Sequence, residues 1–153
     1  MSPTAIQEIR QHQLTEFEKQ SILDHAVDLH LVGSDEADHA GFELIEARAE
    51  TVLHLFRITF ENKPAGILYL LPLAKIRDHV EMTVLVYEAF RGKHITAEVV
   101  GQLESFLSSG RASSVSLCAT VREHNPLRKE LTAFLLRHGY QYSSEHMSFI
   151  KKL

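Results

Sequence analysis

The sequence predicts a mixed α/β (α+β) fold in which helices cover a central sheet. Short runs rich in β-branched and aromatic residues alternate with segments whose apolar residues recur at helical spacing, in the order β-α-α-β-β-β-α-β-α-β. The chain has 153 residues, which is enough for one buried core and too few for two ordinary domains. We therefore expect a single domain over residues 1–153.

The first third of the chain is predicted to contain one strand and two helices. Residues 5–11 alternate weakly in polarity, and Thr15 and Glu18 are the two ends of a capping box that opens a helix. A shorter second helix is expected from Ser34. The apolar stripe of the first helix consists of Ile22, Leu23, Ala26, Val27 and His30, and Gly33 is placed to end it.

A hairpin and a third strand precede the longest predicted helix. Residues 51–60 and 66–71 have strand composition, and residues 62–64 supply the turn between them. Residues 79–87 form the third strand, and residues 108–110 end the helix that follows it. The inner face of that helix is predicted to consist of Ile95, Val99, Leu103, Phe106 and Leu107.

The C-terminal part is predicted to contain a strand, a helix and a last strand. Residues 115–121 are typical of a buried strand, and Asn125 followed by Pro126 indicates an N-cap and a first helical position. Gly139 is placed to end this helix, and residues 140–150 are expected to form the final strand. The inner stripe of the helix is predicted to consist of Leu127, Leu131, Phe134 and Leu135.

Composition excludes several classes of function. Lys and Arg number 16 against 20 Asp and Glu, a formal net charge of −4, so no basic field attracts nucleic acid. No signal-peptide pattern or membrane-spanning run is visible, and Cys118 is the one cysteine, so we expect a soluble cytoplasmic protein with no membrane partner. The 10 histidines are scattered and form no HExxH pattern, so we expect no metal.

The most informative stretch is residues 84–95, where a strand leads through a turn into a helix. Unpaired backbone N–H groups at a helix N-terminus, together with the positive end of the helix dipole, suit an anion such as a pyrophosphate. The alternative is a plain core strand followed by a solvated basic turn.

This stretch resembles the cofactor motif of the GCN5-related N-acetyltransferase (GNAT) superfamily, in which a hydrophobic strand is followed by Arg-Gly-x-Gly-x-Gly/Ala. Residues 121–126, VREHNP, are similar to the family's VRExN turn, and His138-Gly139-Tyr140 is similar to its x-Gly-Phe ending. The resemblance implies a GNAT-like fold with a central mixed, mostly antiparallel sheet flanked by helices.

The resemblance also implies a cofactor site. The backbone of Val84, Leu85 and Val86 would face the pantetheine arm of acetyl-CoA, and Asn125 would face it from the neighbouring strand. The N-cap role alone explains Asn125 equally well. The pyrophosphate would be held by Arg91, Gly92, Lys93, His94, Ile95 and Thr96.

Three positions depart from the family pattern. His94 and Thr96 stand where the family has small residues, and a β-carbon at position 94 either crowds the phosphate or brings an imidazole to it. Leu135 stands where many members have the tyrosine that protonates the leaving thiolate, so the acid would be Tyr142 or water. Glu81 is the best candidate for the base that deprotonates the amine, and the alternative is a solvated residue at the start of a strand.

These features predict an acetyl-CoA-dependent N-acetyltransferase in which a primary amine attacks the thioester directly. The alternative is an acyl-CoA-binding regulatory module with little or no transfer, and a structural protein without a cofactor is a third hypothesis. The acceptor would be a small-molecule or peptide amine. Homodimers are common in the superfamily, and the sequence leaves the oligomeric state and the acyl-chain preference open.

Overall fold

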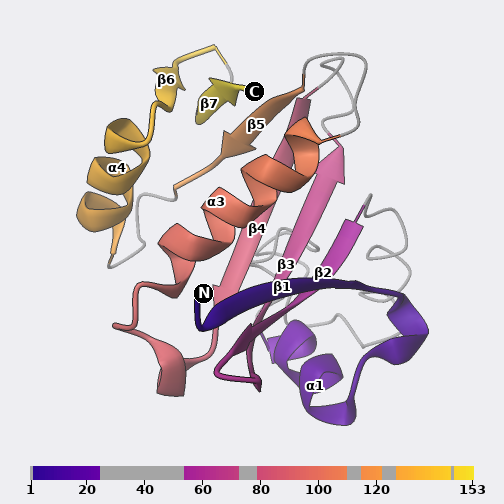
Figure 1. Ribbon diagram of the computed structural model, residues 1–153. Helices are drawn as coiled ribbons and strands as arrows, with labels where there is room; N and C mark the ends of the chain where they lie inside the picture. The colour runs from indigo at the N-terminus through magenta and orange to yellow at the C-terminus, as the bar shows by residue number, and fades with distance from the viewer. Residues whose placement is uncertain (1, 25–53, 73–78, 110–114, 122–126, 146) are drawn as a thin grey trace.

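The computed structural model describes residues 2–24, 54–72, 79–109, 115–121, 127–145 and 147–153 (Figure 1). The helices and strands are β1 (Thr4–Ile9), α1 (Glu16–Asp24), β2 (His54–Phe60), β3 (Lys63–Pro72), β4 (His79–Val86), α3 (Ile95–Ser108), β5 (Ser116–Ala119), α4 (Arg128–Arg137), β6 (Gln141–Ser143) and β7 (Ser148–Lys152). No helix of the described part is long and apolar enough to cross a membrane.

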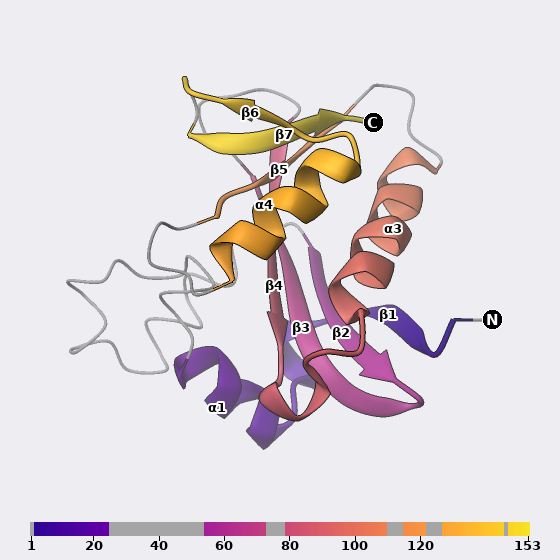
Figure 2. The same cartoon turned by 90° about the vertical axis from the view of Figure 1, so that its left-hand side faces the viewer.

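All seven strands form one sheet in the order β1-β2-β3-β4-β5-β7-β6. β4 and β5 are parallel, and every other neighbouring pair is antiparallel. This confirms the expected mixed, mostly antiparallel sheet. Figure 2 shows α3 on one face of the sheet and α1 on the other.

The predicted capping box opens α1. The N–H of Glu18 donates to Oγ1 of Thr15 at 3.1 Å, and the N–H of Thr15 donates to Oε1 of Glu18 at 2.8 Å. The predicted later part of this helix, its stop and the second helix fall within residues 25–53, which lie outside the described residues.

The hairpin between β2 and β3 turns earlier than predicted. Glu61 and Asn62 both have positive φ, 50° and 66°, which is the pattern of a two-residue type I′ turn. Lys63 and Pro64 therefore belong to β3 and not to the turn. The sheet tolerates the proline because the register between β2 and β3 shifts at Ile58 and Thr59, beside it.

Two C-terminal predictions are corrected. α4 begins at Arg128 with Leu127 at the N-cap, because the first helical bond runs from the N–H of Leu131 to the carbonyl of Leu127. The predicted N-cap, Asn125, and the predicted first helical residue, Pro126, lie outside the described residues. The expected last strand is the hairpin of β6 and β7, because the chain turns before Met147, which has φ of 52°.

Gly139 ends α4 as predicted. Its φ is 89°, the N–H of Gly139 donates to the carbonyl of Leu136, and the N–H of Tyr140 donates to the carbonyl of Leu135. These two bonds form a Schellman motif, which a residue with a β-carbon would strain.

Two apolar clusters hold the layers together. One joins Phe56, Leu68 and Met82 of the sheet to α3, and the other joins Ile67 and Leu85 to Ile22 of α1. The predicted inner faces need three changes. Phe106 is 38% exposed at the border of the core, where its ring meets Phe56 and His54 edge-on. Leu127 is 50% exposed, and Val100, which was not among the predicted residues, is buried.

Candidate functional site

β4 and β5 separate after a short parallel ladder. They pair at three positions, the last of which joins Glu81 to Cys118, whereas β4 pairs with β3 as far as Val86. The side of β4 that faces β5 is therefore open from Met82 to Val86. A strand edge with unpaired backbone groups is a template for an extended ligand.

The direction of the backbone along β4 decides which groups reach the open side. The N–H of Tyr87 donates to the carbonyl of Ala65 in β3 at 2.8 Å, and a β-carbon at Gly66 would lie 2.1 Å from the carbonyl oxygen of Leu85. Tyr87 and Leu85 therefore direct their backbone groups toward β3. Because direction alternates along a strand, Val84 and Val86 direct theirs toward the opening.

This alternation decides the surroundings of Arg91, Leu85 and Gly66. Nε of Arg91 donates to the carbonyl of Val86 at 3.4 Å, on the open side. Leu85 cannot offer its backbone to a ligand there, so the expected trio of Val84, Leu85 and Val86 reduces to two. Gly66 is required opposite Leu85, because any side chain would meet that carbonyl.

A cavity of about 610 Å³ lies along the open side of β4. Its wall is formed by β4, the loop after it, the first turn of α3, the end of β5 and one side of α4. This volume is typical of small-molecule sites. The predicted cofactor residues in the wall are Val84, Leu85, Val86, Arg91, Gly92, His94, Ile95 and Thr96.

The loop before α3 has the backbone geometry of an anion site. Gly92 has φ of 82° and His94 has φ of 58°, whereas Lys93 between them is not in the positive region. Backbone that alternates in this way directs successive N–H groups into one concave site, which suits an anion. His94 is also the N-cap of α3 and makes no capping hydrogen bond with its side chain. The N–H groups of the first turn therefore have no side-chain cap from His94.

The left-handed conformation explains why a glycine suits position 94. Left-handed backbone is unfavourable for a residue with a β-carbon, so His94 strains the loop. Its side chain is exposed and lines the cavity.

The other predicted phosphate residues divide into two groups. Arg91 lines the cavity, whereas Nζ of Lys93 lies 5.7 Å from the centroid of the Phe60 ring and Lys93 is absent from the wall. Asn125 lies outside the described residues. Among the residues that the structure describes, no group of His, Cys, Asp and Glu could hold a metal ion.

Glu81 stands where β4 and β5 separate, and its Oε1 is buried without a hydrogen-bond partner. Burial, and then the charge of Glu81, raise the pKa of the neighbouring Cys118 to about 11. Cys118 is therefore a protonated thiol at neutral pH and a poor nucleophile.

The structure does not bring Tyr142 to the cavity. Tyr142 lies on the edge strand β6, is 56% exposed and packs against Phe149, and both β5 and β7 separate β6 from β4. Tyr140 is buried, and its hydroxyl donates to Oε2 of Glu104 at 3.2 Å. Burial and Glu104 raise the pKa of Tyr140, so it keeps its proton. Leu135 lines the cavity, and no described wall residue is a tyrosine.

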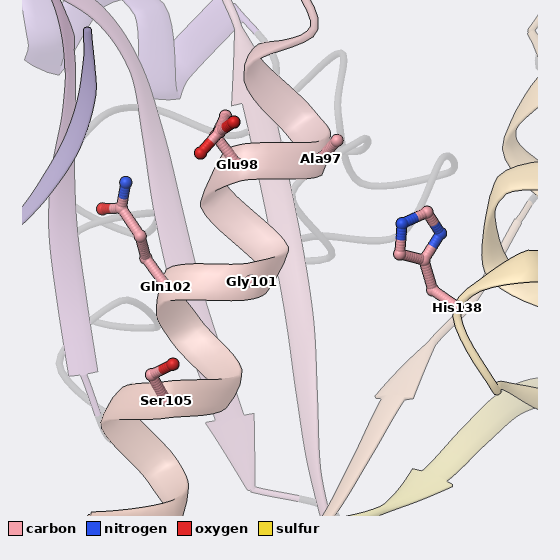
Figure 3. A pocket seen from close by; sticks show the side chains of 6 residues that line it. All are labelled: Ala97, Glu98, Gly101, Gln102, Ser105 and His138. Carbon is pink, nitrogen blue, oxygen red and sulfur yellow. The ribbon is translucent and has the colours of Figure 1, made fainter. Parts of the chain in front are cut away.

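A second hollow, of about 490 Å³, lies on the outer side of α3 (Figure 3). Its polar groups serve the fold: Nε2 of Gln102 donates to the carbonyl of Thr4 at 2.7 Å, and Oε1 of Gln102 accepts from the N–H of Ile6 at 3.1 Å. Nδ1 of His138 lies 2.8 Å from the carbonyl of Phe134. No predicted site residue lines this hollow, so the cavity beside β4 is the better candidate.

Sequence reasoning missed a set of polar groups on the opposite face of β4. Among the described residues, the hydroxyls of Tyr69 and Thr83 and Oε1 of Glu81 are buried without partners, and Ser21 is the side-chain partner of the buried Tyr87 phenol. The available signal was spacing, because Glu81 and Thr83 alternate with apolar residues of β4 and so share one face of the strand.

Comparison with known proteins supports the fold. No protein-family model and no curated protein matches the chain. An acetyltransferase from Thermus thermophilus is similar in structure, with 17% identity, a TM-score of 0.63 and 100% of both chains covered.

Two further solved structures contain ligands. A GNAT family acetyltransferase from Elizabethkingia anophelis with acetyl-CoA bound has 12% identity and a TM-score of 0.60, over 94% of this chain and 80% of that one. The acetyltransferase RimL in complex with coenzyme A has 13% identity and a TM-score of 0.61, over 92% and 81% of the two chains. The chain therefore has the fold of the GNAT family acetyltransferases.

Proposed function

We propose that the protein is an acetyl-CoA-dependent N-acetyltransferase that acts on a primary amine. The observation that supports this most is the open side of β4 above a cavity that ends at the left-handed loop and the N-terminus of α3. A strand edge suits an extended pantetheine arm, and the loop and helix N-terminus suit its pyrophosphate. Both lie on one continuous wall.

The residues present have distinct tasks. The N–H groups of Val84 and Val86 hold the arm and stabilise negative charge that develops on the thioester oxygen. The N–H groups of residues 92–96 and the side chains of Arg91 and His94 hold the phosphates. Acetyl-CoA supplies the activated acetyl group.

Glu81 is the base in this proposal. Glu81 first takes a proton from the ammonium group of the acceptor. The amine nitrogen then bonds to the carbonyl carbon, the carbon–sulfur bond breaks, and the second proton that nitrogen loses passes through water to the sulfur. Water protonates the departing thiolate, because Leu135 replaces a tyrosine and the described wall offers no other tyrosine.

The absence of a tyrosine from the described wall favours one second candidate, an acyl-CoA-binding module with little transfer. Release of CoA from acetyl-CoA, measured over a panel of polyamines, amino acids, amino alcohols and peptides, separates the two. We expect slow release of CoA that depends on the amine. If no amine of the panel causes release although CoA still binds, the acyl-CoA-binding module is favoured.

Glu81→Gln tests the role of the base. We expect a lower rate at neutral pH and unchanged CoA affinity, measured by steady-state kinetics and calorimetry. An affinity loss equal to the rate loss would contradict a base role.

A further inference from the structure

Among the described residues, three buried polar atoms without hydrogen-bond partners lie on the face of β3 and β4 that α1 covers. They are Oε1 of Glu81, Oγ1 of Thr83 and the hydroxyl of Tyr69. The buried phenol of Tyr87 lies further along the same face, where Ser21 of α1 is its side-chain partner. Thr83 is paired directly with Tyr69 across the strands, and alternate residues of β4 share this face with Leu85, which packs in the cluster with Ile22 of α1.

These groups are unusual because native proteins pair nearly all their buried polar atoms. Tyr69 is 0% exposed and Thr83 is 5% exposed, so solvent does not hydrogen-bond to them from the surface. Burial raises the pKa of Tyr87 to about 12 and raises that of Tyr69 further. Both phenols therefore keep their protons and can donate as well as accept.

The row of buried polar residues along this face of β4 begins at Glu81, which lies at the proposed reaction centre. Glu81 occupies the last paired position before β4 and β5 separate, and Thr83 also lines the cavity proposed for acetyl-CoA. A second ligand on the α1 face would therefore meet the thioester through the gap between the strands. Tyr87 lies about 20 Å further along β4, at 3.3 Å per residue, so only a long ligand would reach it.

The charge around the row selects the ligand. Arg57 is a cation whose charge acts on the phenol of Tyr87. Its Nε and Nη2 donate to the two carboxylate oxygens of Glu18 at 2.7 and 2.8 Å, and Nη2 also donates to the carbonyl of Gln13 at 3.0 Å. Arg57 is thus already paired, which leaves the carboxylate of Glu81 and the hydroxyls of Thr83 and Tyr69 to recognise a ligand.

We propose that Glu81, Thr83 and Tyr69 form the acceptor subsite and that they select a primary amine with a hydroxyl group within a few bonds of the nitrogen. The carboxylate of Glu81 receives the ammonium group, and the hydroxyls of Thr83 and Tyr69 bind the hydroxyl of the acceptor. For an amine that carries a carboxylate or phosphate, the guanidinium of Arg57 is not available, because Glu18 and Gln13 already accept its hydrogen bonds. This inference rests on the proposed function.

The test compares 1-amino-2-propanol with propylamine, which lacks only the hydroxyl. We expect wild-type kcat/KM to favour the amino alcohol by at least about a hundredfold, because a site that binds a hydroxyl discriminates strongly against its loss. Tyr69→Phe should reduce that preference to about threefold or less, with unchanged CoA affinity and equal or higher Tm, since it removes an unpaired hydroxyl. Thr83→Val should reduce the preference to the same extent, and its rates are compared at saturating acetyl-CoA because Thr83 also lines that cavity.

Tyr140→Phe is the matched control, because its hydroxyl is paired with Glu104. It should lower Tm and leave the preference intact. Saturation-transfer NMR of both amines on the CoA-loaded protein repeats the comparison without turnover. Equal kcat/KM values of the wild type for the two amines would overturn the inference. A preference for the amino alcohol that remains in both variants would also overturn it. Loss of CoA binding itself would instead contradict the proposed function.

Discussion

At the level of single residues, His94 has two effects of opposite sign. Its left-handed backbone destabilises the free protein, whereas its exposed imidazole lines the cavity beside the first turn of α3. Replacement by glycine separates the two effects, because glycine accepts the conformation and removes the ring.

We predict that His94→Gly raises the free energy of unfolding by about 1 kcal/mol. The same change should weaken CoA binding, because it removes a ring that can donate a hydrogen bond to phosphate. Urea unfolding and calorimetry measure the two effects. Tighter binding by the variant would show that the ring crowds the phosphate instead.

The sequence could place residues 84–96 beside one another, because they form one local strand-turn-helix unit. It could not show that the backbone of Leu85 faces β3 or that Tyr142 lies on the edge strand β6. The backbone direction of Leu85 depends on its register with β3, and the remoteness of Tyr142 depends on β7 lying between β5 and β6. Neither property is visible in a local pattern.

At the level of elements, the local signals for α1 and α4 were reliable where side chains or glycine satisfy the helix ends. The capping box of Thr15 and Glu18 and the stop at Gly139 are both present. The start of α4 was misplaced because Leu127 takes the N-cap position without a side-chain cap. The division of the last strand depends on a turn before Met147, whose residue type does not signal positive φ.

α3 contains a glycine that the fold does not require. A β-carbon at Gly101 would meet no atom within 4 Å, and glycine is unfavourable in a helix interior. We predict that Gly101→Ala raises the free energy of unfolding by about 1 kcal/mol. Gly139→Ala is the contrasting variant, and it should destabilise because φ is 89° there. Equal effects of the two changes on urea midpoints would contradict this account.

α1 is attached to β2 by an ion pair that should respond to acid. Burial opposes ionisation of Glu18, but hydrogen bonds from Arg57 and Thr15 outweigh it and lower its pKa. The carboxylate therefore contributes stability at neutral pH, and that contribution is lost as pH falls below the ordinary glutamate range of about 4.3.

Arg57→Met should remove this contribution and leave Glu18 charged without its main partner. We expect a loss of about 3 kcal/mol at neutral pH, and the difference from wild type should shrink in acid as Glu18 becomes protonated. Unfolding curves between neutral pH and acid measure it. A difference that stays constant with pH would contradict the role of the charge.

At the level of the whole molecule, the fold class and most of the element order could be predicted because periodicity and turn residues agree along the chain. The separation of β4 from β5 could not be read from residue patterns, since it depends on where two distant strands stop pairing. That separation creates the cavity and leaves the backbone of Val84 and Val86 open to it, and Glu81 stands at the last paired position before the strands part.

Titration of the protein with acetyl-CoA by calorimetry, combined with thermal unfolding, tests the central claim most directly. Binding to the open strand and the helix N-terminus predicts a heat of binding and a rise in Tm, with about 2.7 kcal/mol of added stability at a ligand concentration of about one hundred times Kd. No heat and no change in Tm at millimolar acetyl-CoA would contradict the claim that this cavity holds the coenzyme.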